Sequence, residues 1–247
     1  MGDVYEGDEG EIGWESLPGL FPGLGDAERW LPLLRRHAEL LRESAPRVST
    51  TTVDPLAMAG RLYAESLETL RIVQQYAGAQ DEPLVVDVGS GGGFPGLVFA
   101  MVMPGWRVAL VESLRKRASL LGEAANALGL ENVEVIASRA EEAGRGPLRD
   151  TAQIVTARAV AELRELVEYV GPFAEPGGLI ALPKGSRLPE EVAAAGHAMD
   201  ELGLVQMDQV RCRPEASATP WTLLLRKEKL TPGRYPRRPG IPHKRPL

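Results

Sequence analysis

The sequence contains one cysteine, Cys212, in 247 residues. A single thiol excludes a disulfide framework and a cysteine-rich metal site within the chain. The three histidines, His37, His197 and His243, are too scattered to indicate a metal cluster. No uninterrupted apolar run approaches the ~18 residues of a membrane-spanning helix, and the N-terminus lacks the basic and apolar segments of a secretion signal. We therefore expect a cytoplasmic protein without metal, disulfide or membrane association.

Lysine and arginine are absent from residues 1–28, which contain eight acidic residues. In contrast, residues 226–247 carry eight bases and one acid, Glu228. The net charge of −6 therefore conceals two tails of opposite sign. Five prolines in residues 230–247 argue against a helix or a central strand there, so we expect an extended strap, an RNA-binding segment, or both, without a contribution to the cofactor site.

Between the two tails, apolar spacing and capping residues predict first helices and then strands alternating with helices. Such alternation is typical of an α/β fold with a mainly parallel sheet and helices on both faces. Seven strands are expected, at 84–88, 107–111, 133–137, 154–156, 178–182, 204–210 and 221–226, the last two as an antiparallel pair. The predicted organisation is an acidic, flexible head (1–26), a helical extension (27–80), the sheet domain (81–228) and the basic, proline-rich tail (229–247).

The segment 84–96 combines a buried strand, a glycine turn and a helix start. Glycines at 89, 91, 92 and 93 permit positive φ and let a ligand lie against bare backbone. Pro95 suits the first turn of a helix, where its missing N–H costs nothing. The segment therefore predicts a site for a nucleotide-like ligand.

Two ligand patterns overlap in this turn. Gly91, Gly93 and Gly96 match the G-x-G-x-x-G fingerprint of dinucleotide-binding proteins, with Glu112 close to the expected acidic position. Read from Asp87 through Gly89, Gly91 and Gly93, the turn looks like the D-x-G-x-G-x-G motif of S-adenosylmethionine-dependent methyltransferases. We favour the second pattern, because Asp87 would engage the cationic methionine part of that cofactor and would repel a pyrophosphate. The chain also has no further domain after the sheet to hold a dehydrogenase substrate.

In open α/β sheets ligands bind at the carboxyl ends of the strands, so residues that follow the strands are the site candidates. Glu112 is placed to accept hydrogen bonds from two ribose hydroxyls, or to lie at a helix start. Arg158 follows an apolar run and needs an anionic or carbonyl partner, and Lys184 could bind substrate or a backbone carbonyl. The full candidate set is Asp87, Gly89–Phe94, Glu112, Arg139–Glu141, Arg158 and Lys184.

Several motifs together resemble the bacterial small-subunit ribosomal RNA guanine-N7 methyltransferases, also called the glucose-inhibited division protein B family. They are residues 87–96, Val-Glu-Ser at 111–113 with Lys116-Arg117, Ser-Arg-Ala-Glu-Glu at 138–142, Ala-Arg-Ala-Val at 157–160, Lys184-Gly185 and the closing tail. The resemblance covers about residues 30–247 and implies a Rossmann-like, seven-stranded methyltransferase sheet. It departs from the family pattern at Val48 and Leu62, where relatives commonly have Asn and His.

This resemblance implies methylation of N7 of one guanine in 16S ribosomal RNA by S-adenosylmethionine. The partner would be that RNA or a precursor of the small ribosomal subunit, and the protein is expected to be a monomer. By matching position, the family's cofactor contacts fall on Gly89, Phe94, Ala140, Glu141 and Arg158.

Guanine N7 carries an in-plane lone pair, so methyl transfer requires alignment and no general base. We expect Arg158 or Lys184 to be the catalytic residue that holds the O6 side of the base or a nearby phosphate. Two alternatives remain open at this point, a NAD-linked oxidoreductase and a non-catalytic RNA-binding protein with a methyltransferase fold.

Overall fold

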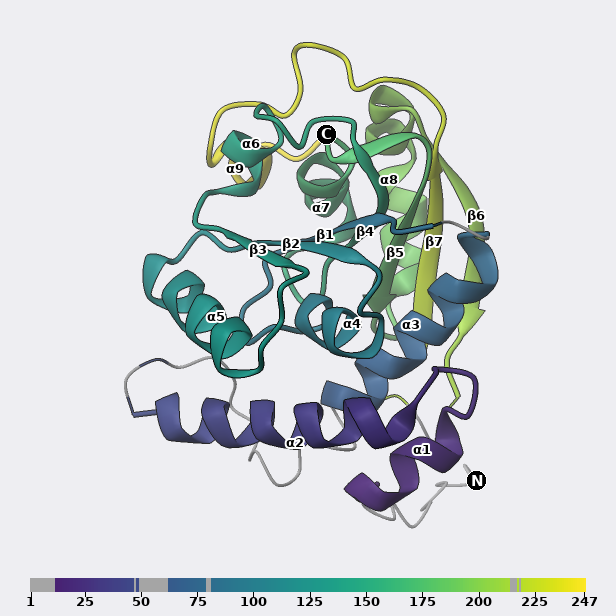
Figure 1. Ribbon diagram of the computed structural model, residues 1–247. Coiled ribbons are helices and arrows are strands. Elements are labelled where there is room, and N and C mark those ends of the chain that lie inside the picture. The colour runs from purple at the N-terminus through teal and green to yellow at the C-terminus, as the bar shows by residue number, and fades with distance from the viewer. Residues whose placement is uncertain (1–11, 47, 49–61, 79–80, 214–216, 218) are drawn as a thin grey trace, which may run out of the picture.

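The computed structural model describes residues 12–46, 48, 62–78, 81–213, 217 and 219–247, which form a seven-stranded sheet flanked by helices (Figure 1). The strands are β1 (Leu84–Val88), β2 (Arg107–Val111), β3 (Val133–Ile136), β4 (Ala152–Thr156), β5 (Ala174–Lys184), β6 (Leu204–Arg211) and β7 (Trp221–Lys227). The helices are α1 (Leu17–Leu20), α2 (Ala27–Ser44), α3 (Ala64–Tyr76), α4 (Gly96–Val102), α5 (Arg115–Ala127), α6 (Ala140–Ala143), α7 (Leu163–Val170), α8 (Leu188–Leu202) and α9 (Ile241–Lys244), preceded by a 3-10 turn at Trp14–Ser16. The predicted α/β class and strand count are confirmed. Residues 1–11 of the expected acidic head, and residues 47 and 49–61 around Val48, lie outside the described residues.

The strand order is β3-β2-β1-β4-β5-β7-β6. Neighbouring strands from β3 to β5 are parallel, and β7 is antiparallel to both β5 and β6. The expected antiparallel pair is therefore confirmed. Strand β5 begins four residues before the predicted start at residue 178, because the Gly177-Gly178 pair, which suggests a turn, is accommodated by a register irregularity against β4.

Successive residues of the central strands face two separate apolar clusters. In β1, Val85 packs with the cluster formed by α1 to α5, whereas Val86 packs with the cluster formed by α6 to α8. This alternation follows from the two-residue period of a strand. Both faces of the sheet are covered by helices, as predicted (Figure 1). Among the described residues, each helix is too short or too polar to span a lipid bilayer.

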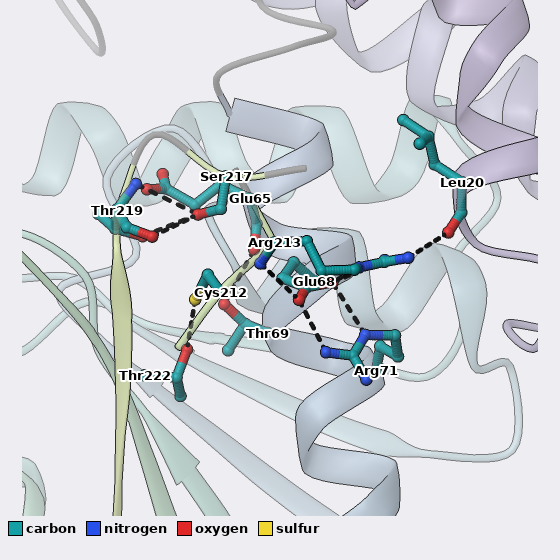
Figure 2. Close-up of polar contacts among 10 residues, drawn as sticks. All are labelled: Leu20, Glu65, Glu68, Thr69, Arg71, Cys212, Arg213, Ser217, Thr219 and Thr222. Atoms are coloured by element: carbon teal, nitrogen blue, oxygen red, sulfur yellow. Dashed lines mark hydrogen bonds and ion pairs between the residues drawn. The ribbon is translucent and has the colours of Figure 1, made fainter. Parts of the chain in front are cut away.

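A buried carboxylate connects the N-terminal helices to the edge of the sheet (Figure 2). Glu68 of α3 is fully buried and accepts hydrogen bonds from Arg71 at 2.7 and 2.9 Å and from the guanidinium of Arg213, just after β6, at 2.7 and 3.0 Å. Arg213 also donates to the carbonyl of Leu20 in α1, at 3.0 Å. Burial alone would raise the pKa of Glu68, but the hydrogen bonds from both arginines lower it to about 2. This cluster ties α1, α3 and the sheet edge into one unit.

The C-terminal tail is an ordered strap. It runs from β7 past α8 to α9, which lies beside α6 and α7 (Figure 1). Arg149 donates to the carbonyls of Thr231 and Tyr235, at 2.7 and 2.8 Å, and the buried Glu168 accepts hydrogen bonds from Arg237 at 2.6 to 3.0 Å. The expectation that the tail contains no helix is wrong for the single turn α9, because Pro242 occupies its first turn, where the missing N–H is not needed.

Candidate functional site

A cavity of about 440 Å³ lies at the carboxyl ends of β1, β2 and β3. It is adjacent to the point between β1 and β4 where the strand order reverses, which is the usual ligand site of an open α/β sheet. Its walls come from six parts of the chain. They are Val88 and Gly89; Val111 and Ser113; Ser138, Arg139, Ala140 and Glu141; Val160; Glu165 and Tyr169; and Gly240, His243 and Lys244.

The glycine turn forms one wall of this cavity. Gly89, Gly91 and Gly93 have φ values of +74°, +56° and +94°, so the predicted need for positive φ is confirmed at these three positions. A Cβ atom at Gly89 would lie 2.7 Å from a methyl carbon of Val160. Any other residue at position 89 would therefore both strain the turn and close the cavity wall. Gly91 and Gly93 shape the turn without lining the cavity themselves.

Asp87 lies at the end of β1, beside the turn, and is completely buried. Its Oδ2 accepts a hydrogen bond from the amide of Gly96, at the start of α4, at 3.0 Å. Its Oδ1 is buried without a hydrogen-bond partner among the described residues. The pKa of Asp87 is raised to about 7, mainly by burial and to a smaller degree by Glu112, against the opposing effects of the Gly96 amide, the Ser90 hydroxyl and Arg158. Asp87 is not among the described residues that line the cavity, so it lies beneath the glycine turn as a buried carboxyl group without an ion-pair partner.

Glu112 joins the glycine turn to the helix that follows β2. One carboxylate oxygen accepts from the amide of Gly91 at 3.0 Å, and the other accepts from the amide of Leu114 at 2.8 Å. Only 4% of the residue is exposed, and the next residue, Ser113, lines the cavity. The helix-start role considered from the sequence is therefore present, and the ribose role stays a prediction.

The segment Arg139–Glu141 lines the cavity, as predicted from its position after β3. Glu141 is buried and its Oε1 accepts a hydrogen bond from the amide of Gly240, in the tail, at 2.9 Å. Two further groups were missed by sequence reasoning. The hydroxyl of Tyr169 donates to Glu165 at 2.6 Å, and Nδ1 of His243 lies 3.2 Å from the same carboxylate. No local motif marks these residues, because α7 and the tail meet only in the folded chain.

Phe94 faces away from the cavity, toward the helical extension. Its ring centre lies 5.0 Å from that of Tyr63 and 5.5 Å from that of His37. His37 is fully buried, contacts the Tyr63 hydroxyl at 2.9 Å through Nδ1, and has its pKa lowered to about 4 by burial. A cofactor contact at position 94 would therefore come from the backbone. No sequence pattern indicates that His37, 57 positions earlier, supports this turn.

Both cations expected at the site are engaged in ion pairs. Nε of Arg158 donates to Glu65 of α3 at 2.5 Å, which supplies the anionic partner that its buried surroundings require. Lys184 pairs with Glu191 of α8 and lies 3.3 Å from the carbonyl of Ala161, the alternative partner foreseen from the sequence. About a quarter of the Arg158 side chain remains exposed, compared with 9% for Lys184. Neither residue is among the described residues that line the cavity.

The segment between Arg158 and the cavity is strained. Ala159 has a φ of +54°, which is uncommon for a residue with a Cβ, and Val160 beyond it lines the cavity. Such strain persists only where surrounding structure enforces it, and it is concentrated at functional sites. Val160 belongs to the Ala-Arg-Ala-Val motif, so the sequence marked this segment without indicating which of its residues reaches the cavity.

The arrangement suits a nucleoside-sized ligand. The volume falls in the range of ordinary small-molecule sites. Apolar side chains at Val88, Val111 and Val160 offer a surface for a planar ring, and the hydroxyl of Ser113 and the carboxylate of Glu141 offer polar edges. The Gly89 turn fits a ligand that approaches the backbone closely, and the buried carboxyl group of Asp87 beneath the turn would favour a ligand that carries positive charge.

Comparisons with known proteins agree with these features. The family model for rRNA small subunit methyltransferase G matches residues 33–217. The Ribosomal RNA small subunit methyltransferase G of Symbiobacterium thermophilum is 40% identical over 220 residues, which cover 85% of this chain and 87% of the relative. The protein of the same name from Roseiflexus sp. is 36% identical over 230 residues, which cover 91% and 95%.

A solved structure of a mutant of MtNAS in complex with S-adenosylmethionine matches with a TM-score of 0.56 at 20% identity, over 89% of this chain and 86% of that one. A putative transferase from Pyrococcus horikoshii matches with a TM-score of 0.51 at 20% identity, over 66% and 62%. At such identities these structures bear on the fold alone. The resemblance inferred from the motifs is confirmed by the family match, and the chain belongs to the rRNA small subunit methyltransferase G family.

Proposed function

We propose that this protein transfers a methyl group from S-adenosylmethionine to N7 of a guanine in 16S ribosomal RNA. The observation that carries the proposal is the glycine turn with Asp87 beside it, opening on a cavity that Glu141 and Ser113 line. Family membership supports the substrate class. We further propose that the protein acts as a monomer, since its own helices cover both faces of the sheet. We place it in the cytoplasm because its family modifies ribosomal RNA.

The residues divide into a cofactor group and a substrate group. S-adenosylmethionine, when bound, supplies a methyl group on a sulfonium. Gly89, Ala140 and Glu141 would hold its adenosine part in the cavity, and Glu112 and Asp87 would act from beneath the glycine turn. The positive charge of the cofactor would supply the partner that the Oδ1 of Asp87 lacks. Gly91, Gly93 and Phe94 would contribute through backbone conformation.

Arg158 is the stronger candidate for the substrate group. Its exposed portion and its position next to the strained Ala159 allow a contact with guanine O6 or a phosphate, whereas Lys184 is nearly enclosed by Glu191 and Ala161. Glu65 fixes the guanidinium in place, and no proton has to be removed from guanine N7. We therefore expect the turnover rate at saturating cofactor to stay flat from about pH 6.5 to 8.5.

The test is incubation of the full chain with 16S rRNA and methyl-labelled S-adenosylmethionine, followed by mass spectrometry of the nucleosides. We expect label in 7-methylguanosine, and loss of that nucleoside from the rRNA of cells that lack the gene. Label in another nucleoside would contradict the N7 assignment. RNA binding without incorporation would indicate a non-catalytic binding protein, and binding of NADH in place of S-adenosylmethionine would indicate an oxidoreductase.

Arg158→Lys is the informative variant, and Glu65→Gln measures separately what loss of the ion pair with Arg158 costs. Arg158→Ala would leave the buried Glu65 without its partner, so loss of activity could reflect unfolding. Lysine keeps the charge but cannot reproduce the planar guanidinium contact. We expect Arg158→Lys to lower the turnover rate at least tenfold, an estimate for removal of one charged hydrogen bond. An unchanged turnover rate in Arg158→Lys would remove Arg158 from the substrate group.

A further inference from the structure

The last eight residues of the chain close one side of the cavity. Gly240, His243 and Lys244 belong to its lining, and no other part of the described tail does. The amide of Gly240 also donates to Glu141 at 2.9 Å, and Glu141 is only 3% exposed. The turn α9 therefore both covers the cavity and fixes the carboxylate that forms its polar edge.

This turn is held less firmly than the tail before it. Upstream, Arg237 is bound to the fully buried Glu168 and Arg149 donates to buried tail backbone. Downstream, the side chain of His243 is 77% exposed where it contacts Glu165, and the hydrogen bond from Arg164 to the carbonyl of Leu247 is also exposed. Within residues 241–247 only Pro242 is buried. Segments held by few, exposed contacts open locally at low free-energy cost. Residues 240–247 can therefore leave the cavity while the tail up to Pro239 stays in place.

The outer surface of the same segment is positively charged. Arg238 and Arg245, here called the outer tail arginines, flank α9; both are exposed, and neither guanidinium has a partner among the described residues. Arg139, also exposed, lines the cavity next to Glu141, the residue that accepts a hydrogen bond from Gly240. Arginines without internal partners bind phosphates in a polyanion, with release of counterions.

We infer that residues 240–247 couple the binding of RNA to the binding of the cofactor: RNA phosphates on the outer tail arginines hold α9 closed over the occupied cavity. This inference rests on the proposed function. By linkage, RNA must then raise the affinity for the cofactor by the same factor by which the cofactor raises the affinity for RNA. The coupling would keep the cofactor in place while the substrate is engaged.

The experiment compares three variants with the full chain. One stops after Pro239, which removes α9 but keeps the contacts of Arg237 and Tyr235. The second, Arg238→Ala with Arg245→Ala, removes only the outer charges. The third, Arg234→Ala, removes an exposed tail ion pair with Glu201 and serves as the control, since Arg234 is not in the cavity lining. Affinity and dissociation rate are measured for S-adenosylhomocysteine, which cannot transfer a methyl group, with and without a 16S rRNA transcript.

For the full chain and the control we expect the transcript to tighten S-adenosylhomocysteine binding about fivefold or more, the lower end of typical coupling. The chain ending at Pro239 should bind it about tenfold more weakly, a decrease typical of removing one side of a site, and should show no effect of RNA. The double arginine variant should match the full chain without RNA and lose most of the RNA effect.

Equal affinity in the full chain and in the chain ending at Pro239, or an RNA effect that survives in that shortened chain, would overturn the inference. A full chain that binds S-adenosylhomocysteine but shows no RNA effect would overturn it as well, without touching the proposed function. A full chain that binds no S-adenosylhomocysteine would instead refute the proposed function, and the inference with it.

Discussion

Asp87 should release a proton when the cofactor binds near neutral pH. In the free protein this carboxyl is fully buried, has one unpartnered oxygen and has its pKa raised by burial from 3.8 to about 7. A raised carboxyl pKa means that the folded protein holds this proton more tightly than the unfolded chain does. The cofactor-free protein should therefore lose stability as pH rises from about 4 to about 7.

A cationic ligand beside Asp87 reverses this effect, because an opposite charge within ~4–6 Å lowers a carboxyl pKa by one to three units. If the pKa falls from about 7 to about 5, ligand binding releases roughly 0.5 proton at pH 7 and about 0.8 at pH 6, but only about 0.1 at pH 8. Arg158 and Glu112 act on Asp87 in both states and so shift its starting value without producing the release.

Calorimetric titration in two buffers of different ionisation enthalpy measures the number of protons released. The variant Asp87→Asn keeps an acceptor for the Gly96 amide and cannot titrate, so the difference from the unmodified chain isolates Asp87. Equal proton release by the two proteins at pH 6 and pH 7 would refute the assignment of Asp87 to the cationic part of the ligand.

Three other predictions concern separate parts of the molecule. Glu68→Gln should lower the unfolding free energy by roughly 3 kcal/mol at neutral pH, with cofactor affinity unchanged. It should also remove the decrease in stability that the native chain shows as pH falls from about 4.5 to 2, which urea titrations at several pH values measure. Glu112→Gln should weaken cofactor binding by roughly 1.5–3 kcal/mol if the carboxylate reaches ribose. If calorimetry shows the native affinity, the role of Glu112 is limited to its contacts with Gly91 and the start of α5. Alanine at both outer tail arginines should reduce the slope of log RNA affinity against log salt by about 0.7–0.9 for each phosphate that the variant no longer binds. An unchanged slope would mean that the tail packs on the domain without contacting RNA.

The sheet could be predicted because its strands are marked locally. Buried runs such as 84–88 and 107–111 are almost entirely apolar, and each ends where glycines or charges begin. Strand β5 shows the limit of this approach. Its first residues, Ala174 to Gly177, contain proline and glycine, and only pairing with β4 makes them strand. The start of β5 therefore depends on a neighbour 22 positions earlier in the chain.

The site could be predicted to a similar extent. Gly89, Ala140 and Glu141 reach the cavity because they follow strands whose carboxyl ends meet in any sheet of this topology. The expectation that the tail takes no part in the cofactor site is wrong for the cavity, because Gly240, His243 and Lys244 line it. The position of α9 depends on the anchoring of Arg237 by Glu168, some seventy residues away, which no local pattern marks. Charge composition marked the tail as basic, but composition cannot separate the residues that bind internal carboxylates from the outer tail arginines.

The helical extension and the sheet domain, distinct in sequence pattern, are joined at the site. Glu65 of α3 fixes Arg158 after β4, and His37 of α2, together with Tyr63, packs on Phe94 in the glycine turn. A displacement of α2 or α3 would therefore disturb both the predicted substrate contact and the turn that shapes the cofactor cavity. Because the buried Glu68 cluster binds α3 to the sheet edge, the position of the extension is fixed from its far side as well. The extension is thus part of the structure that holds the site in place, and separating the chain near residue 80 would remove interactions on which the site depends.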